Sequence, residues 1–274
     1  MYYDDGKKLN VRFLPLGKVC DYYIMEIVPN DSSLFRSAVE ALKEFLPQVQ
    51  LHISAAGIKI YGMDMSHVGY IDYFLAAADC AVLNVPTPAN IGIQMAVLSR
   101  ALNAVGAGDK VTLSTKKDKF LISYENAKMG KKAMYEISTL YIEEESMEIP
   151  ETTYAASVKA KTSDILSVVK ESATFGDTIS LGLDENGFHV EAVGDAGTVK
   201  QTLENTDDRE MELTEDAVHV SYGAKYIMQI MKGGAPLSTV TQLEFDETQP
   251  LKASFRFGVA SYFVAYLAPK ITAE

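Results

Sequence analysis

Apolar residues follow two different spacings along the chain, and each spacing predicts a different element. Between Leu34 and Leu46 they recur every third or fourth position, which predicts a helix with one buried face. Apolar and polar residues then alternate over 49–54 and 58–63, on either side of Gly57, which predicts a β-hairpin. The same rules predict the remaining elements of this half: strands at 21–28, 68–76, 110–115, 120–125 and 131–140, and a second helix at 91–105.

The second half of the chain repeats this order of elements. A second hairpin is predicted at 178–193, and its turn residue Gly187 lies 130 positions after Gly57. The pair Val240-Thr241 echoes Val111-Thr112 at an offset of 129. Two offsets that agree within one residue predict an internal duplication of about 130 residues. The other elements predicted here are strands at 154–160 and 197–203, a helix at 165–174 capped by Thr162, Ser163 and Asp164, and a helix at 223–231 ended by Gly233 and Gly234.

Two helices and several short strands in each half predict an α+β fold, with two similar domains of antiparallel sheets that carry two helices each. We expect an N-terminal extension at 1–20, a first domain at 21–140, a connector at 141–151 and a second domain at 152–274.

The connector combines two kinds of signal. Glu143, Glu144 and Glu145 repel one another and favour a solvated linker. Met147 and Ile149 are two positions apart, so in an extended chain their side chains point the same way. The segment is therefore either an ordinary surface linker or a strap that forms one lip of a binding groove.

Composition narrows the class of protein. No run of about 18 apolar residues predicts a membrane span, and the charged N-terminus does not resemble a signal peptide. The two cysteines, Cys20 and Cys80, are far apart and fit a reducing compartment rather than a disulfide framework or a zinc site. The formal net charge is -12, so the chain as a whole repels nucleic acid. A role on DNA must therefore depend on where the cations lie.

The cations are distributed in a way that allows such a role. Every predicted helix carries a basic residue opposite its apolar face, whereas much of the acid lies at 143–145 and 207–216. Lysines on helix surfaces are often simply solvated, so the pattern is suggestive and not specific. The six helix positions are Arg36, Lys43, Arg100, Lys170, Lys225 and Lys232.

No motif in the sequence predicts an enzyme. Asp64, Ser66 and His67 are close in sequence, but a catalytic triad needs geometry between separate elements, which neighbours in one loop seldom achieve. The glycines at 106–108 resemble a phosphate loop, yet they precede strand-like VTLST and not a helix. The four histidines are dispersed without metal-binding spacing. We therefore expect no catalytic residue, no metal and no cofactor.

Several motifs resemble, in order and spacing, those of the proliferating cell nuclear antigen family of DNA sliding clamps. The resemblance runs from about Asp21 to Ile271 and leaves residues 1–20 outside. The motifs are VEALKEF at 39–45, MDMSHV at 63–68, MEIPE at 147–151, APLSTVTQL at 235–243 and YLAPKI at 266–271.

The resemblance implies a ring of three chains that encircles duplex DNA without reading its sequence. Such a ring acts as a processivity factor for DNA polymerase in replication and repair, in the nucleus or at a viral or archaeal replication site. It implies that the six basic helix residues face the DNA. It also implies that a polymerase, the clamp loader, flap endonuclease and ligase dock through short peptides with a glutamine and two aromatic residues. The implied peptide groove comprises Met63, His67, Val68, Tyr70, Met147, Ile149, Pro250, Tyr266, Ala268, Pro269 and Ile271.

This sequence departs from the family pattern at informative places. Glu185 stands in the second predicted hairpin turn, where many eukaryotic relatives carry a modifiable lysine, so we expect that switch to be missing. Ser37, Asn103, Ser167 and Thr174 replace basic residues of the DNA-facing surface, which predicts weaker contact with DNA. The alternative is a monomeric or dimeric processivity factor of the same fold that holds DNA electrostatically. That alternative requires a strongly basic exposed face, against which the pI of about 4.9 argues.

Overall fold

The computed structural model describes residues 25–106, 108–116, 118–126, 128–143, 152–195 and 197–270. The first half contains two helices and nine strands, together with a 3₁₀ turn at Ala77–Asp79. In chain order they are β1 (Glu26–Pro29), α1 (Ser32–Lys43), β2 (Gln48–Ser54), β3 (Gly57–Met63), β4 (Gly69–Ala76), β5 (Cys80–Asn84), β6 (Ala89–Gln94), α2 (Met95–Leu102), β7 (Lys110–Lys116), β8 (Lys119–Asn126) and β9 (Lys131–Ser138).

The second half has helices and strands in the same order, so each half forms one domain of the same design. Its elements are β10 (Ala156–Lys161), α3 (Thr162–Ser172), β11 (Thr178–Asp184), β12 (Gly187–Gly194), β13 (Gly197–Leu203), β14 (Glu210–Leu213), β15 (Val218–Gly223), α4 (Ala224–Gly234), β16 (Val240–Phe245), β17 (Leu251–Phe257) and β18 (Ser261–Leu267).

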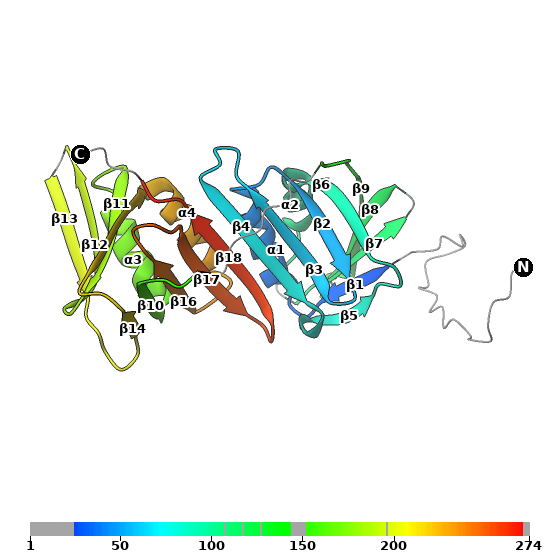
Figure 1. Ribbon diagram of the computed structural model, residues 1–274. Helices are drawn as coiled ribbons and strands as arrows, with labels where there is room; N and C mark the ends of the chain where they lie inside the picture. The colour runs from blue at the N-terminus through cyan, green and yellow to red at the C-terminus, as the bar shows by residue number, and fades with distance from the viewer. Residues whose placement is uncertain are drawn as a thin grey trace, which may run out of the picture.

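The strands form three antiparallel sheets, one of which crosses the domain boundary (Figure 1). A five-stranded sheet of the first domain has the order β5-β1-β7-β8-β9, and a four-stranded sheet of the second has the order β13-β12-β11-β15. The nine-stranded sheet, β14-β10-β16-β17-β18-β4-β3-β2-β6, joins five strands of the second domain to four of the first. The junction is the pair β18–β4, which runs from Tyr262 opposite Phe74 to Leu267 opposite Gly69. The two domains therefore share one continuous sheet.

The four helices pack side by side in the order α2, α1, α4, α3 on one side of the sheets (Figure 1). Each buries an apolar face: Phe35 and Leu42 of α1, for example, are 4% and 0% exposed. Burial of a side chain of this size stabilises the fold by about 1.5–3 kcal/mol. The carboxylate of Asp31 caps α1 by accepting hydrogen bonds from the backbone N–H groups of Ser33 and Leu34.

Hydrogen bonds correct the offset of the internal repeat. The hydroxyl of Ser32 accepts a hydrogen bond from the backbone N–H of Val111 in the first domain. The hydroxyl of Thr162 pairs with that of Thr241 in the second domain. Thr162 lies 130 positions after Ser32, and Thr241 lies 130 positions after Val111, so Val111 corresponds to Thr241 and not to Val240. Burial agrees, because Val111 and Thr241 are fully buried whereas Val240 is 42% exposed.

The predicted boundaries of all four helices differ from the structure; α1, predicted at 34–46, spans Ser32–Lys43. Residues 91–94 belong to strand β6 and pair with β2, so α2 begins only at Met95 and ends at Leu102. Ile91 and Ile93 are both buried and lie two positions apart, which is the spacing of a strand. Ile91 also fits the helical spacing of the residues that follow, which is why the sequence pattern predicted a helix there. Helix α3 begins at Thr162, so Thr162 is not a cap; its hydroxyl donates to the buried carbonyl of Ser238.

Gly233 and Gly234 lie inside the last turn of α4 rather than beyond its end. A Cβ at Gly234 would lie 2.1 Å from the ring of Phe255, and one at Gly233 would lie 2.9 Å from the Cβ of Ala41 in α1. The two glycines therefore permit close packing of α4 on the sheet and on α1. The sequence pattern predicted no strand over β5, β14, β15, β16, β17 or β18, and it placed most of β6 in a helix.

A buried carboxylate fastens the domains together near the junction. Asp79, in the 3₁₀ turn after β4, accepts hydrogen bonds from the backbone N–H groups of Val259, Ala260 and Ser261 and from the Ser261 hydroxyl. Burial raises the pKa of this carboxyl, but the hydrogen bonds outweigh it, and the pKa lies below its ordinary value. The ionised side chain thus holds the β17–β18 turn of the second domain against the first.

Candidate nucleic-acid interface and partner groove

The six basic residues predicted on helices all lie on the helix layer, away from the sheets. Arg100, Lys170, Lys225 and Lys232 are exposed, whereas Arg36 and Lys43 of α1 are half-buried. Of the positions where the family pattern is basic, Ser37 is half-buried, and Asn103, Ser167 and Thr174 are exposed.

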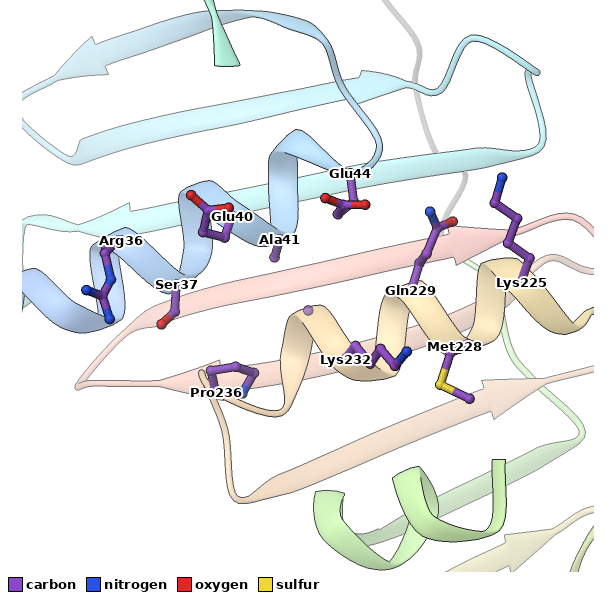
Figure 2. A pocket seen from close by; sticks show the side chains of 11 residues that line it. Arg36, Ser37, Glu40, Ala41, Glu44, Lys225, Met228, Gln229, Lys232 and Pro236 are labelled. Atoms are coloured by element: carbon purple, nitrogen blue, oxygen red, sulfur yellow. The ribbon is translucent and has the colours of Figure 1, made fainter. Parts of the chain in front are cut away.

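A shallow groove of about 520 Å³ runs between α1 and α4 and brings three of the basic residues together. Figure 2 shows Arg36 on the α1 side and Lys225 and Lys232 on the α4 side. Glu40 and Glu44 of α1 also line the groove, so one wall is acidic in part and the other is basic. Met228, Gln229 and Pro236 also line the groove and were not predicted as site residues from the sequence, because only the packing of α4 on α1 identifies them.

Both basic residues of α1 are held by contacts within the chain. The guanidinium of Arg36 donates to the carbonyl oxygen of Val105 at 2.6 Å. The ammonium of Lys43 pairs with the carboxylate of Glu40 and donates to the hydroxyl of Ser99 on α2 at 3.3 Å. Ser99 in turn donates to Glu40. Burial raises the pKa of the Glu40 carboxyl, but hydrogen bonds from Lys43 and Ser99 outweigh it, so the pKa is lower than usual and Glu40 stays ionised at neutral pH.

The cations of the other helices have fewer partners. Arg100 donates only within its own helix, to the carbonyl of Ala96. Within the part of the chain that the structure describes, no carboxylate lies within ion-pair distance of Lys170, Lys225 or Lys232.

The described residues of the second predicted site, the partner groove, come mostly from strands at the junction of the two domains. Tyr70 on β4 lies opposite both Met63 on β3 and Tyr266 on β18, and the two tyrosine rings are 6.2 Å apart. The backbone N–H of Ala268 donates to the carbonyl of Val68. The structure therefore brings these five predicted residues together from distant parts of the sequence.

The remaining predicted groove residues fall into two sets. Pro250 directly precedes β17, whose first residue Leu251 pairs with Leu267, so Pro250 lies beside the segment that holds Ala268 and Pro269. Met147, Ile149 and Ile271 lie outside the described residues.

The loop that carries His67 is built around Asp64. The Asp64 carboxylate accepts hydrogen bonds from the backbone N–H groups of Ser66, Val68 and Gly69 and from the hydroxyl of Tyr226 on α4. His67 is exposed and has a left-handed backbone, with φ 55°. In this described loop no side-chain hydrogen bond joins Asp64 to His67, so the arrangement of a catalytic triad is not formed.

No metal centre or membrane helix emerges from the side chains and helices that can be described. Across the described ranges, no group of three or more His, Cys, Asp or Glu side chains is placed to hold a metal ion. The helices within those ranges are too short or too polar to cross a membrane.

Each sheet has two edge strands, and two of these matter for assembly: β9 at one end of the five-stranded sheet and β13 at one end of the four-stranded sheet. Their counterparts in the repeated fold are β18 and β4, because β9 and β18 each follow the last hairpin of a domain and β4 and β13 each follow the first. Those counterparts pair with each other inside the chain. Two repeated domains, a layer of helices with basic residues and this pair of matching edges define the class of DNA sliding clamps.

Comparison with known proteins identifies the family. Residues 24–147 match the model of the N-terminal domain of proliferating cell nuclear antigen, and residues 148–271 match that of its C-terminal domain. The chain belongs to the proliferating cell nuclear antigen family. It is 24% identical over 251 residues to proliferating cell nuclear antigen 2 of Drosophila melanogaster, covering 90% of this chain and 98% of that protein.

Two further relatives agree with this assignment. The chain is 24% identical over 257 residues to proliferating cell nuclear antigen of Chaetomium thermophilum, covering 90% of this chain and 98% of that protein. The crystal structure of the protein from Entamoeba histolytica superposes with a TM-score of 0.84 at 26% identity, covering 91% of this chain and all of that one. The expected family and fold class are thereby confirmed, and the protein is a DNA sliding clamp.

Proposed function

We propose that three copies of this chain close head to tail into a ring around duplex DNA and tether replication and repair proteins to it. The observation that carries the proposal is the repeated junction. Inside one chain β18 pairs with β4, and the equivalent strands β9 and β13 are left at open edges. An open edge pairs readily with another strand, and a head-to-tail contact that closes forms a ring.

The repeat also predicts the register of the contact between chains. Within the chain Ala265 lies opposite Ile71, and Phe263 lies opposite Tyr73. Transfer of this register to the open edges places Tyr135 of one chain opposite Val199 of the next, and Ala133 opposite Gln201. Tyr135 is 37% exposed, whereas its counterpart Ala265 is fully buried. Ring closure would thus cover an apolar side chain that is left open in the single chain.

Helix packing supports the same contact. Inside the chain α1 packs on α4, and the equivalent helices α3 and α2 would pack on each other between chains. Phe45, just after α1, is 6% exposed, and its counterpart Phe175, just after α3, is 37% exposed. Phe175 is therefore a second large apolar side chain that is partly exposed where the next chain would pack.

Such a ring would place the basic helix layer around the DNA and leave acid on the outside. Contact with phosphates alone would be weak, because few cations face the DNA and their effect falls steeply with salt. Retention would instead be topological, since a closed ring cannot leave a circular duplex without opening.

The groove at the domain junction would dock the partners. Tyr70, Tyr266 and small Ala268 offer an apolar wall and room for aromatic side chains, with the connector as the expected opposite lip. The guest we propose is a short peptide with a glutamine, an aliphatic residue and two aromatics, wound as one 3₁₀ turn. Polymerase, clamp loader, flap endonuclease and ligase would use it, in the nucleus of a eukaryotic cell.

Solution mass at micromolar concentration tests the ring. We expect a species of three times the 30.0 kDa of one chain in sedimentation equilibrium. A monomer or dimer at this concentration would contradict the ring and favour a processivity factor of the same fold that holds DNA electrostatically.

A further inference from the structure

The internal repeat shows that the two domains carry opposite charge at one equivalent position of the helix layer. Helices α1 and α3 begin at Ser32 and Thr162, which are 130 positions apart. At the same offset Glu40 of the first domain corresponds to Lys170 of the second. One site on the surface that faces DNA is therefore anionic in one domain and cationic in the other.

The second helices differ in the same direction, because α4 carries two lysines whereas α2 carries one arginine, Arg100. Helices α2 and α4 begin at Met95 and Ala224, which are 129 positions apart and are both buried. At this offset Lys225 and Lys232 correspond to the neutral Ala96 and Asn103. Both lysines are exposed, and on the described part of the chain neither has an ion-pair partner.

The first domain has three of the six helix cations; Arg100 is exposed, but the other two are already engaged. Lys43 is held between the Glu40 carboxylate and the Ser99 hydroxyl, and Arg36 is held by the Val105 carbonyl. A phosphate that binds Lys43 must break this network and approach the Glu40 charge. Ordering a lysine against a phosphate gains little when an equally near carboxylate is lost in exchange.

We propose that the second domain holds the DNA backbone, through Lys170, Lys225 and Lys232, and that Glu40 withholds Lys43 from the DNA. This inference rests on the proposed clamp function. In a three-chain ring it creates three strong contact sectors that alternate with three weak ones. Figure 2 shows the boundary of two sectors within one groove, which is lined by Glu40 and Glu44 from α1 and by Lys225 and Lys232 from α4.

Paired substitutions test the two halves of the proposal on the intact trimer. Binding of a fluorescent 30-base-pair linear duplex is followed by anisotropy over a series of salt concentrations, starting low enough for sequence-independent contacts to be measured. Lys225→Ala combined with Lys232→Ala should weaken binding about tenfold or more at low salt and reduce the salt dependence. Lys43→Ala should change affinity by less than about twofold, because Lys43 is already neutralised.

Glu40→Gln tests the withholding role, and Glu44→Gln is its matched control. Both remove one carboxylate from the same groove wall, but only Glu40 pairs with Lys43. Glu40→Gln should strengthen DNA binding more than Glu44→Gln does. In the Lys43→Ala background this advantage should disappear, which a double-mutant cycle measures directly.

Two results would overturn the inference: a loss with Lys43→Ala as large as with the Lys225 and Lys232 pair, or equal gains from Glu40→Gln and Glu44→Gln. Failure of the ring itself is a separate outcome. It would appear as the absence of trimer, or as loss of the unsubstituted protein from nicked circular DNA, whatever the lysine variants do.

Discussion

Val199→Asp should convert the trimer into monomers. Val199 is the third residue of the open edge strand β13 and is half-buried in the single chain. Its counterpart Ile71 is 0% exposed at the junction inside the chain. Ring closure would bury Val199 against Tyr135 of the next chain, so a carboxylate there would lose its hydration without a partner, at a cost of several kcal/mol per contact.

Sedimentation equilibrium measures the result. The mass should fall from three times to one times 30.0 kDa at micromolar concentration. Val259→Asp is the matched control, because Val259 is 80% exposed in the β17–β18 turn and lies on neither open edge. That variant should remain a trimer. Both variants should also unfold cooperatively on heating, as a chain that keeps its fold does. A trimeric Val199→Asp protein would show that β13 does not close the ring.

Tyr266→Ala should abolish docking of glutamine-plus-aromatic peptides at micromolar concentration. Tyr266 stands on β18 with its ring 6.2 Å from that of Tyr70, and together they form the apolar wall of the groove that we propose. Removal of an aromatic anchor at the centre of an interface typically costs on the order of 2–4 kcal/mol, which is roughly 30-fold to 1000-fold in affinity. Titration calorimetry with a synthetic peptide measures the loss.

Tyr262→Ala provides the comparison for this substitution. Tyr262 is on the same strand and the same sheet face, but at the opposite end, where its hydroxyl accepts a hydrogen bond from Lys59. Peptide affinity should be unchanged in that variant. An equal loss in both variants would mean that Tyr266 acts through the stability of β18 rather than through contact with the peptide.

Much of the fold followed from local pattern. The hairpin around Gly57 and its repeat around Gly187 both formed, since alternation and a turn glycine act over a few residues. The start of α2 did not follow, because Ile91 fits a strand and a helix equally well until its pairing with β2 is known. The edge strand β5 was missed because its residues show little alternation of burial. The edge strand β14 alternates, but over only four residues, which is too short a pattern to predict a strand.

For the candidate sites, too, local pattern predicted some features, whereas others depend on contacts between distant elements. Helical phase alone placed the six basic residues on one surface. It gave no sign that Ser99 of α2 joins Glu40 and Lys43 of α1, since that contact spans two helices. The groove needed more than phase, because Tyr70 and Tyr266 meet only through the sheet that joins the domains. Resemblance to a known family supplied that set, and the structure brings its described members together.

Retention on DNA of defined topology tests the central claim most directly. Protein loaded onto nicked circular DNA should stay with the DNA through gel filtration at physiological salt. A single cut in the circle should release it, because a closed ring slides off a free end whereas its direct contacts with phosphates are too few to hold it. Equal retention on circular and linear DNA would contradict a topological clamp and would favour electrostatic binding instead.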